Sequence, residues 1–206
     1  MRGAAVGVNS PLFYFVRHGE TDWNAERRLQ GQLDIPLNDV GRRQSAQCGV
    51  TLRSLIAARC KTPADFAFIS SPLSRARETM EILRGVLGLP RDGYTTDPRL
   101  AELSFGRWEG LTYKEVRALD RAALAARERD KWNFVAPQGE SYAKLLVRVR
   151  DWQASLTSDA IVAAHGGVAR ALMVLFGVRT LEDAPHGDVL QGVVYEFGPG
   201  VMNWHG

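Results

Sequence analysis

The chain has 206 residues, of which 45% are apolar and 24% are charged, a composition typical of a globular protein. The 26 basic and 23 acidic residues leave a formal charge of +3, and without a long Lys/Arg block this balance argues against a nucleic-acid partner. Two cysteines outside any C-x-x-C pair argue against a disulfide framework or a metal cage, and no apolar run is long enough for a membrane span.

The first ten residues, MRGAAVGVNS, lack the extended apolar segment of a signal peptide. We expect residues 1–10 to be a disordered extension and residues 11–206 to form a single domain. We also expect a cytoplasmic protein, because its few cysteines suit a reducing compartment. Composition leaves a homodimer open.

Short apolar runs bounded by turn residues predict buried strands. The first is LFYFV at 12–16, which runs directly into an arginine and a histidine. The second is FAFIS at 66–70 and the third is AIVAAH at 160–165. We expect GVVYEF at 192–197 to be the last strand of the chain.

Helices are predicted between these strands. Asn38 is placed to cap a helix that runs to about Arg59, and a second helix spans about 74–87. The capping box that begins at Thr112 opens another. Two more helices are predicted, one with apolar residues at 142, 145, 149, 152 and 156 and one from 166 to about 176. Alternating strands and helices predict an α/β fold, a three-layer αβα sandwich with a mostly parallel central sheet.

Polar side chains follow three of the predicted strands. Arg17 and His18 follow the first strand, Arg75 lies early in the helix after the second, and His165 ends the third. Ligands of open α/β sheets bind beyond the carboxyl ends of the strands, so these four residues are expected at one edge. Arginine forks suit the charge that a phosphoryl group spreads over its oxygens during transfer. The sequence therefore predicts a site for a phosphorylated ligand.

Four segments in this order, RHGETDWN, SSPLSRARET, LAELSFGRWEG and AAHGGVAR, resemble the histidine phosphatase superfamily of phosphoglycerate mutase-like proteins. The resemblance covers about residues 12–197. It implies that His18 is a nucleophile that becomes phosphohistidine and that Glu102 is the proton donor. It also implies that Arg17, Arg75 and His165 hold the phosphoryl oxygens.

The resemblance further implies that Thr21, Asn24 and Gly166 lie at the phosphate. Arg77 is the less favoured partner, because the family's arginine aligns with Arg75. The family's chemistry needs no metal or cofactor, and the substrate class it implies is a small phosphorylated metabolite. The sequence lacks a G-x-x-x-x-G-K-[ST] loop, a D-x-D pair and a cysteine with an arginine six positions later, as other phosphate-handling enzymes would need.

The proposed chemistry places demands on two residues. His18 must attack through an unprotonated nitrogen, so its other ring nitrogen should donate to a carbonyl. Glu102 must hold a proton for the leaving group, and its neighbours Leu103, Phe105 and Trp108 could supply an apolar setting. Glu109 in the same loop is the alternative acid.

Three functions stay open: a phosphomonoesterase, a mutase and a protein that binds a phosphate ligand without catalysis. Cofactor-dependent mutases of this family carry a long insertion between the acid and the second histidine. The connection from Glu102 to His165 is short, and we expect one helical segment and a PQGES turn in it. The short connection favours the phosphatase branch.

Other conspicuous residues receive structural interpretations. We expect the basic residues after Thr112 to form a solvated helix face, with a substrate-facing lid as the alternative. These are Arg117, Arg121, Arg127, Arg129 and Lys131. Cys48 is expected in the core because it shares a helical stripe with Leu52, and His186 and His205 are expected at the surface.

Overall fold

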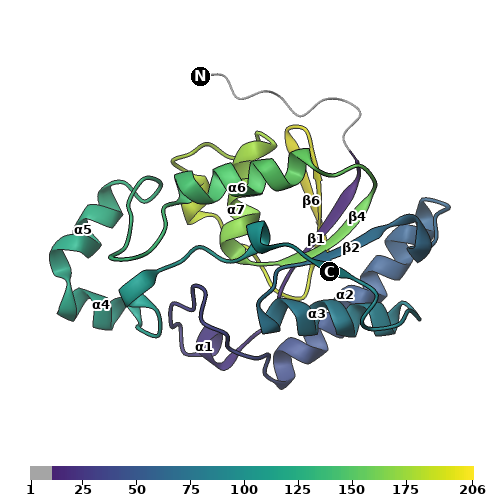
Figure 1. Ribbon diagram of the computed structural model, residues 1–206, viewed down its shortest axis with the longest axis horizontal. Helices are drawn as coiled ribbons and strands as arrows, with labels where there is room; N and C mark the ends of the chain where they lie inside the picture. The colour runs from purple at the N-terminus through teal and green to yellow at the C-terminus, as the bar shows by residue number, and fades with distance from the viewer. Residues whose placement is uncertain (1–10) are drawn as a thin grey trace.

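The computed structural model describes residues 11–206, so the extension predicted at residues 1–10 lies outside the described residues. Within the described part, six strands form one sheet in the order β3-β2-β4-β1-β5-β6 (Figure 1). The first four are mutually parallel, and the last two run antiparallel to their neighbours. The strands are β1 Phe13–Arg17, β2 Ala67–Ser70, β3 Thr95–Thr96, β4 Ala160–Ala164, β5 Val194–Gly198 and β6 Val201–His205.

The five predicted helices are present as α2, α3, α4, α6 and α7, and the short α1 and α5 were not predicted. They are α1 Asp22–Ala25, α2 Asp39–Ala58, α3 Ser74–Val86, α4 Tyr113–Leu119, α5 Arg121–Arg129, α6 Tyr142–Ala154 and α7 Gly166–Leu175. Asn38 caps α2, because its side chain accepts a hydrogen bond from the N–H of Gly41 at 2.9 Å. The predicted capping box of Thr112 and Glu115 opens α4. None of the helices described has the length and apolar character that crossing a membrane would require.

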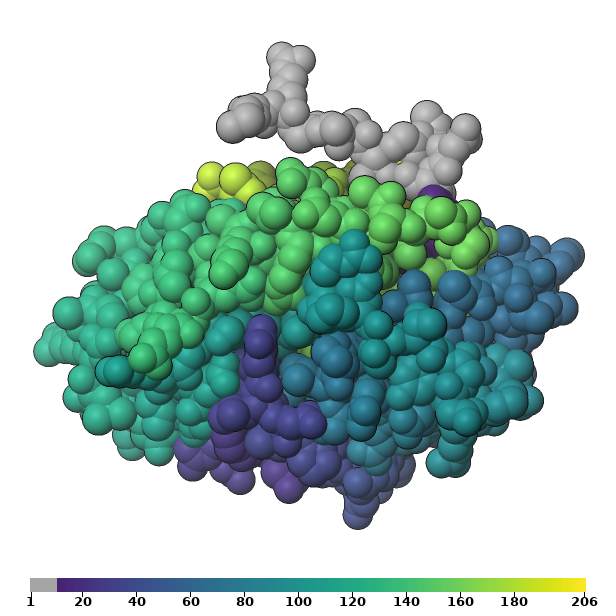
Figure 2. All heavy atoms as spheres, viewed as in Figure 1, coloured from purple at the N-terminus to yellow at the C-terminus, as the bar shows by residue number. Residues whose placement is uncertain are grey.

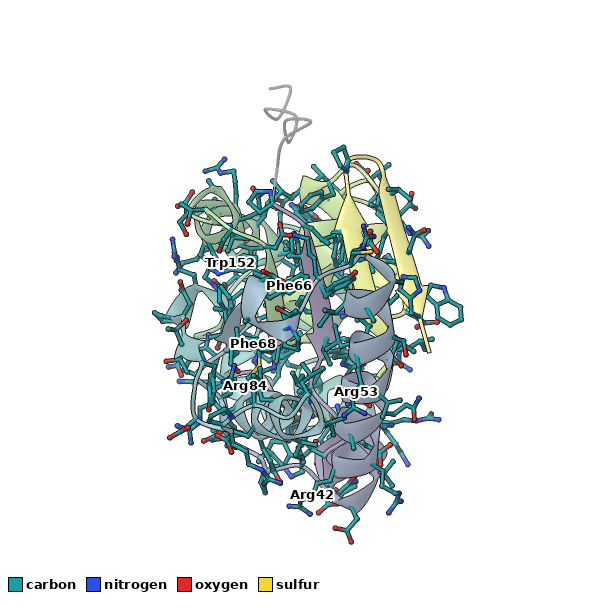
Figure 3. All side chains as sticks on the ribbon, turned by 90° about the vertical axis from the view of Figure 1, so that its right-hand side faces the viewer. Arg42, Arg53, Phe66, Phe68, Arg84 and Trp152 are labelled. Atoms are coloured by element: carbon teal, nitrogen blue, oxygen red, sulfur yellow. The ribbon has the colours of Figure 1, made fainter. Side chains whose placement is uncertain are left out.

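The alternation of side chains along β1 divides the core into two layers. Phe13 and Phe15 face one side and pack in a cluster with α6 and α7. Tyr14 and Val16 face the other side, against α2 and α3. In Figure 1, α6 and α7 lie above the sheet and α2 and α3 below it. The predicted three-layer αβα sandwich with a mostly parallel sheet is confirmed. Figure 3 labels Trp152 from the first cluster, and Phe66 and Phe68 from the second.

Helices α4 and α5 extend beyond the sheet, at the left of Figure 1. Figure 2 shows their teal atoms at one end of the molecule, with the dark purple segment that follows β1 on the surface between them and the blue atoms of the α2–α3 side. A separate apolar cluster holds this region together, and Trp108 within it stacks on Phe134 with ring centroids 5.4 Å apart. The prediction of one helical segment between Glu102 and the PQGES turn is wrong, since both α4 and α5 lie there.

Two strands were not predicted. The strand at 192–197 is present as β5, but β6 follows it and ends the sheet. The sequence VMNWH of β6 has no apolar run, because as an edge strand it is largely exposed, with Trp204 at 60%. The short β3 has only two exposed threonines. Both strands form because they pair with a neighbouring strand, β3 with β2 and β6 with β5. Their own sequences contain no pattern that predicts a strand.

The structural interpretations of Cys48, His186 and His205 are confirmed. Cys48 is buried between α2 and the sheet, where burial raises the pKa of its thiol to about 12. His186 is exposed, and His205 is partly exposed with its Nε2 3.8 Å from a carboxylate oxygen of Glu196.

Candidate active site

Three neighbouring strands deliver the predicted site. β4 lies between β1 and β2, so the carboxyl ends of these parallel strands are adjacent. His18 follows β1, His165 follows β4 and Ser71 follows β2. Two backbone hydrogen bonds continue the ladder into the loops, from His18 N–H to the carbonyl of Ala164 and from Ser71 N–H to that of Ala163, both 2.9 Å. The topology thus brings the two histidines together from positions far apart in sequence.

His18 is held in one tautomer. Its side chain is buried, and its Nδ1 lies 2.8 Å from the carbonyl oxygen of Gly19. A carbonyl only accepts, so Nδ1 carries the proton and Nε2 keeps its lone pair. Burial, followed by the positive charges of Arg75 and Arg17, lowers the pKa of His18 well below its ordinary value. The expected contact of one ring nitrogen with a carbonyl is present, and the lowered pKa favours the neutral imidazole.

The loop that carries His18 packs against the start of α2 through two glycines. The N–H of Gly19 donates to Thr79 Oγ1 at 3.1 Å. A Cβ on Gly19 would collide with the backbone of Gly41, and one on Gly41 would collide with the backbone of Glu20. The two backbones therefore touch without side chains between them. This contact sets the distance between the loop that carries His18 and the start of α2.

His165 is fully buried beside His18, and the two ring centroids are 5.1 Å apart. Its Nε2 lies 2.7 Å from the hydroxyl of Ser71, whereas its Nδ1 is buried without a hydrogen-bond partner among the described residues. Burial, followed by the charges of Arg75 and His18, lowers the pKa of His165 well below its ordinary value. The ring is therefore a neutral group with an unused nitrogen beside His18.

Two arginines complete the surroundings of His18. Arg75 is fully buried and donates to the carbonyls of Gly31 and Leu33, each at 2.7 Å. Arg17 donates through Nη1 to the carbonyl of Val189 at 2.6 Å. The Nε of each is buried with no hydrogen-bond partner within residues 11–206. Arg77 is exposed on the outer face of α3, so the structure favours Arg75 over it, as the alignment did.

Glu102 lines the cleft and is fixed by backbone donors at the first turn of α7. The N–H of Gly167 lies 3.0 and 3.1 Å from its two carboxylate oxygens, and the N–H of Leu103 lies 2.8 Å from Oε1. A Cβ on Gly167 would collide with Oε1, so this approach requires the glycine. Leu103 and Phe105 line the cleft beside Glu102 as expected, but Trp108 does not, because it packs under α4 and α5.

Glu109, the alternative acid, has a different place. Its Oε1 accepts hydrogen bonds from the N–H of Gln32 and the hydroxyl of Ser104 at 3.1 Å, and from the N–H of Phe105 at 3.0 Å. It is not among the residues that line the cleft. The carboxylate of Glu109 therefore ties two loops together.

Of the three further residues predicted at the phosphate, two line the cleft and one does not. Asn24 and Gly166 line the cleft, and Asn24 Oδ1 accepts from Gln191 Nε2 at 3.1 Å. Thr21 does not line it, because its buried hydroxyl caps α1 by accepting from the N–H of Asn24. Gln191 was not predicted; its Nε2 also donates to the carbonyl of His18 at 3.0 Å.

The cleft has a volume of about 260 Å³ and extends from His18 toward α4 and α5. Arg127 of α5 and Lys131 line it, so these two do not belong to a solvated helix face. Arg127 is only 8% exposed. The solvated interpretation fits the rest of the set, since Arg117, Arg121 and Arg129 are exposed.

Arg170 also lines the cleft and was not predicted as a site residue. A signal was present, because Arg170 lies one helical turn after Gly166, on the helix that directly follows His165. Among the described residues no group of three His, Cys, Asp or Glu side chains is arranged to hold a metal ion.

The chain is similar to several known proteins over most of its length. The glucosyl-3-phosphoglycerate phosphatase of Mycolicibacterium vanbaalenii is 36% identical over 171 residues, which cover 76% of this chain and 70% of that protein. Phosphoglycerate mutase-like protein 4 of Arabidopsis thaliana is also 36% identical, over 76% of this chain and 67% of its own. The solved structure of a mycobacterial glucosyl-3-phosphoglycerate phosphatase superposes with a TM-score of 0.75 at 27% identity, covering 90% of this chain and 89% of that one. The family model described as histidine phosphatase superfamily (branch 1) matches residues 13–199, and the chain belongs to this superfamily.

Proposed function

We propose that the protein is a phosphomonoesterase that acts through a phosphohistidine on His18 and needs no metal. One observation supports this proposal most directly. Arg17 and Arg75 line the same cleft as His18, and the ring of His165 lies 5.1 Å from that of His18. Each of these three neighbours has a buried nitrogen without a partner among the described residues: Nε of Arg17, Nε of Arg75 and Nδ1 of His165. Buried polar groups are normally hydrogen-bonded, so this arrangement suits an anion with several acceptor oxygens.

In the first step His18 Nε2 attacks the phosphorus of the bound ester, and the bond from phosphorus to the leaving oxygen breaks. Arg17 and Arg75 stabilise the charge on the phosphoryl oxygens. His165 contributes as a donor when its Nδ1 carries the proton. Glu102 gives its proton to the leaving oxygen, so an alcohol departs instead of an alkoxide.

In the second step a water molecule attacks the phosphorus of phosphohistidine. Glu102, now a carboxylate, takes a proton from this water as the new bond forms. The bond from phosphorus to Nε2 breaks, and His18 returns to its neutral form with the proton still on Nδ1. Inorganic phosphate leaves, and Glu102 is protonated again for the next cycle.

A mutase is the second candidate, since one relative is named phosphoglycerate mutase-like. It would form the same phosphohistidine but return the phosphoryl group to a hydroxyl of an organic molecule. Binding without catalysis is disfavoured, because all five proposed catalytic residues are present. We also propose that the substrate is a small metabolite and that the protein works in the cytoplasm, where its two free thiols would stay reduced.

Rapid-quench trapping of the phosphoenzyme tests the proposal. With radiolabelled nitrophenyl phosphate and EDTA present, we expect base-stable, acid-labile label on His18, and inorganic phosphate that carries one oxygen from labelled water. The variant His18→Ala should show neither. Label on another residue, or complete loss of activity with EDTA, would contradict the mechanism. Transfer to an added alcohol in place of water would favour the mutase.

A further inference from the structure

The cleft beside His18 holds more positive charge than one phosphoryl group requires. Six cationic side chains of the described residues line it, against the single carboxylate of Glu102. The six are Arg17, Arg28, Arg75, Arg127, Lys131 and Arg170. Arg17 and Arg75 serve the phosphoryl group, and Arg28 is paired with Glu26 at 2.6 Å and Glu115 at 3.2 Å. We call the other three, Arg127, Lys131 and Arg170, the distal cluster.

The distal cluster is oriented by neutral groups. Lys131 Nζ donates to the carbonyl of Pro185 at 2.6 Å, and Arg170 Nε donates to that of Gly187 at 3.0 Å. The guanidinium of Arg127 lies over the ring of Tyr113, 5.2 Å from its centroid. Within residues 11–206, no carboxylate oxygen lies within 4.0 Å of these three cations. Their positions are therefore fixed while their charges stay uncompensated.

The three charges are close enough to affect one another. Burial, followed by the positive charges of Arg127 and Arg170, lowers the pKa of Lys131 to about 8. Like charges gathered in a partly buried cleft destabilise the free protein and raise the local concentration of anions. The arrangement is therefore more favourable with an anion among the three side chains than without one.

The distal cluster lies in the same cleft as His18 and begins beside the phosphoryl-binding residues. A Cβ on Gly166 would lie 3.2 Å from Nη1 of Arg170 and 3.6 Å from Nε of Arg17. Lys131 and Arg127 line the same cleft, and Arg127 belongs to α5. One ligand can therefore contact both groups of cations if it carries charge at both ends.

We propose that the substrate carries a second anionic group, a carboxylate or another phosphate, which the distal cluster binds while the phosphomonoester lies beside His18. This inference rests on the proposed phosphatase function and specifies its substrate class. Hydrogen bonds between charged groups here contribute to binding of the substrate and of the transition state alike, so the second anion lowers KM more than it raises kcat.

A matched series of phosphomonoesters tests the inference. Alkyl phosphates of increasing length are compared with a terminal hydroxyl, a terminal carboxylate or a terminal phosphate. We expect kcat/KM to be about tenfold or more higher for the charged ester than for the hydroxyl ester at one or more lengths. The carboxylate and phosphate arms show which of the two anions is preferred.

Lys131→Met should remove most of this preference, chiefly through KM, and the milder Lys131→Gln tests the same contact if the first variant folds poorly. Arg129→Met is the matched control, because Arg129 is an exposed cation nearby that does not line the cleft; it should leave the preference intact. Equal kcat/KM for charged and neutral esters at every length would overturn the inference. So would a full preference in both Lys131 variants. Failure to turn over even nitrophenyl phosphate, with no phosphoenzyme, would instead overturn the proposed function and this inference with it.

Discussion

The rings of His18, which lines the cleft, and His165 lie with centroids 5.1 Å apart and planes inclined by 59°. Both rings are buried next to Arg17 and Arg75, and both pKa values are lowered for that reason. Two imidazolium ions could not share this place with two guanidinium groups at low cost. Neutrality of the pair is thus a property of the fold, and the proposed mechanism requires this neutral form of His18.

Stability should therefore depend on pH. In the unfolded chain a histidine takes up a proton near pH 6.5, whereas in the folded protein His18 and His165 resist protonation. The unfolded state binds more protons below about pH 6.5, so the free energy of unfolding should fall as the pH drops from there. Urea unfolding at constant ionic strength, from about pH 8 to 5, measures this loss.

The double variant His18→Asn, His165→Asn should lose less stability over the same range. His186→Asn is the control, because that histidine is exposed, and it should follow the unmodified protein. An unchanged slope in the double variant would show that other groups cause the acid sensitivity.

Glu102→Gln should affect substrates according to their leaving groups. An alkoxide is a strong base and needs the proton of Glu102, whereas nitrophenolate leaves without it. We expect phosphoenzyme formation to slow far more with alkyl esters than with nitrophenyl phosphate. Hydrolysis of phosphohistidine should also slow, because glutamine cannot take a proton from water. Rapid-quench kinetics should then show a burst of nitrophenol followed by slow turnover.

Glu109→Gln serves as the matched comparison. Since Glu109 ties two loops together through three hydrogen bonds, its loss should lower the melting temperature without dependence on the leaving group. Equal slowing of both esters in Glu102→Gln, without a burst, would move the acid role away from Glu102.

Arg75 and Arg77 should respond very differently to the same change. Lysine at position 75 cannot reach the carbonyls of Gly31 and Leu33 and still present a donor toward His18, so Arg75→Lys should lower kcat/KM about 100-fold. Arg77→Lys on the exposed face of α3 should change it less than about threefold. Steady-state kinetics, with melting temperatures to verify folding, compare the two variants. A mild effect at Arg75 would mean that its guanidinium only supports the loop at Gly31.

The sequence predicts the features that depend on local patterns. Each apolar strand that ends in a polar residue, and each capped helix, carries its signal within a few positions, so His18, Arg75 and His165 could be placed at one edge. The signals for Lys131 and Arg127 are different in kind. A cation on a polar helix looks the same whether it faces solvent or a cleft, and only the packing of α5 against the rest decides between them. The prediction for Thr21 was wrong in the opposite direction: it was expected at the phosphate, but its hydroxyl caps α1. A residue beside the motif that carries His18 can have a purely structural role.

Because Gly41 packs directly against Gly19, the position of His18 depends on a residue that takes no part in the proposed chemistry. Neither glycine carries a functional group, yet a single methyl on Gly41 would push the start of α2 away from the loop that holds His18. In the proposed mechanism, a displacement of about 1 Å there would misplace Nε2 relative to phosphorus, although every proposed catalytic residue remained in the chain. Inherited variation at Gly41 should accordingly be as restricted as at His18, and a comparison that scores only reactive side chains would overlook it.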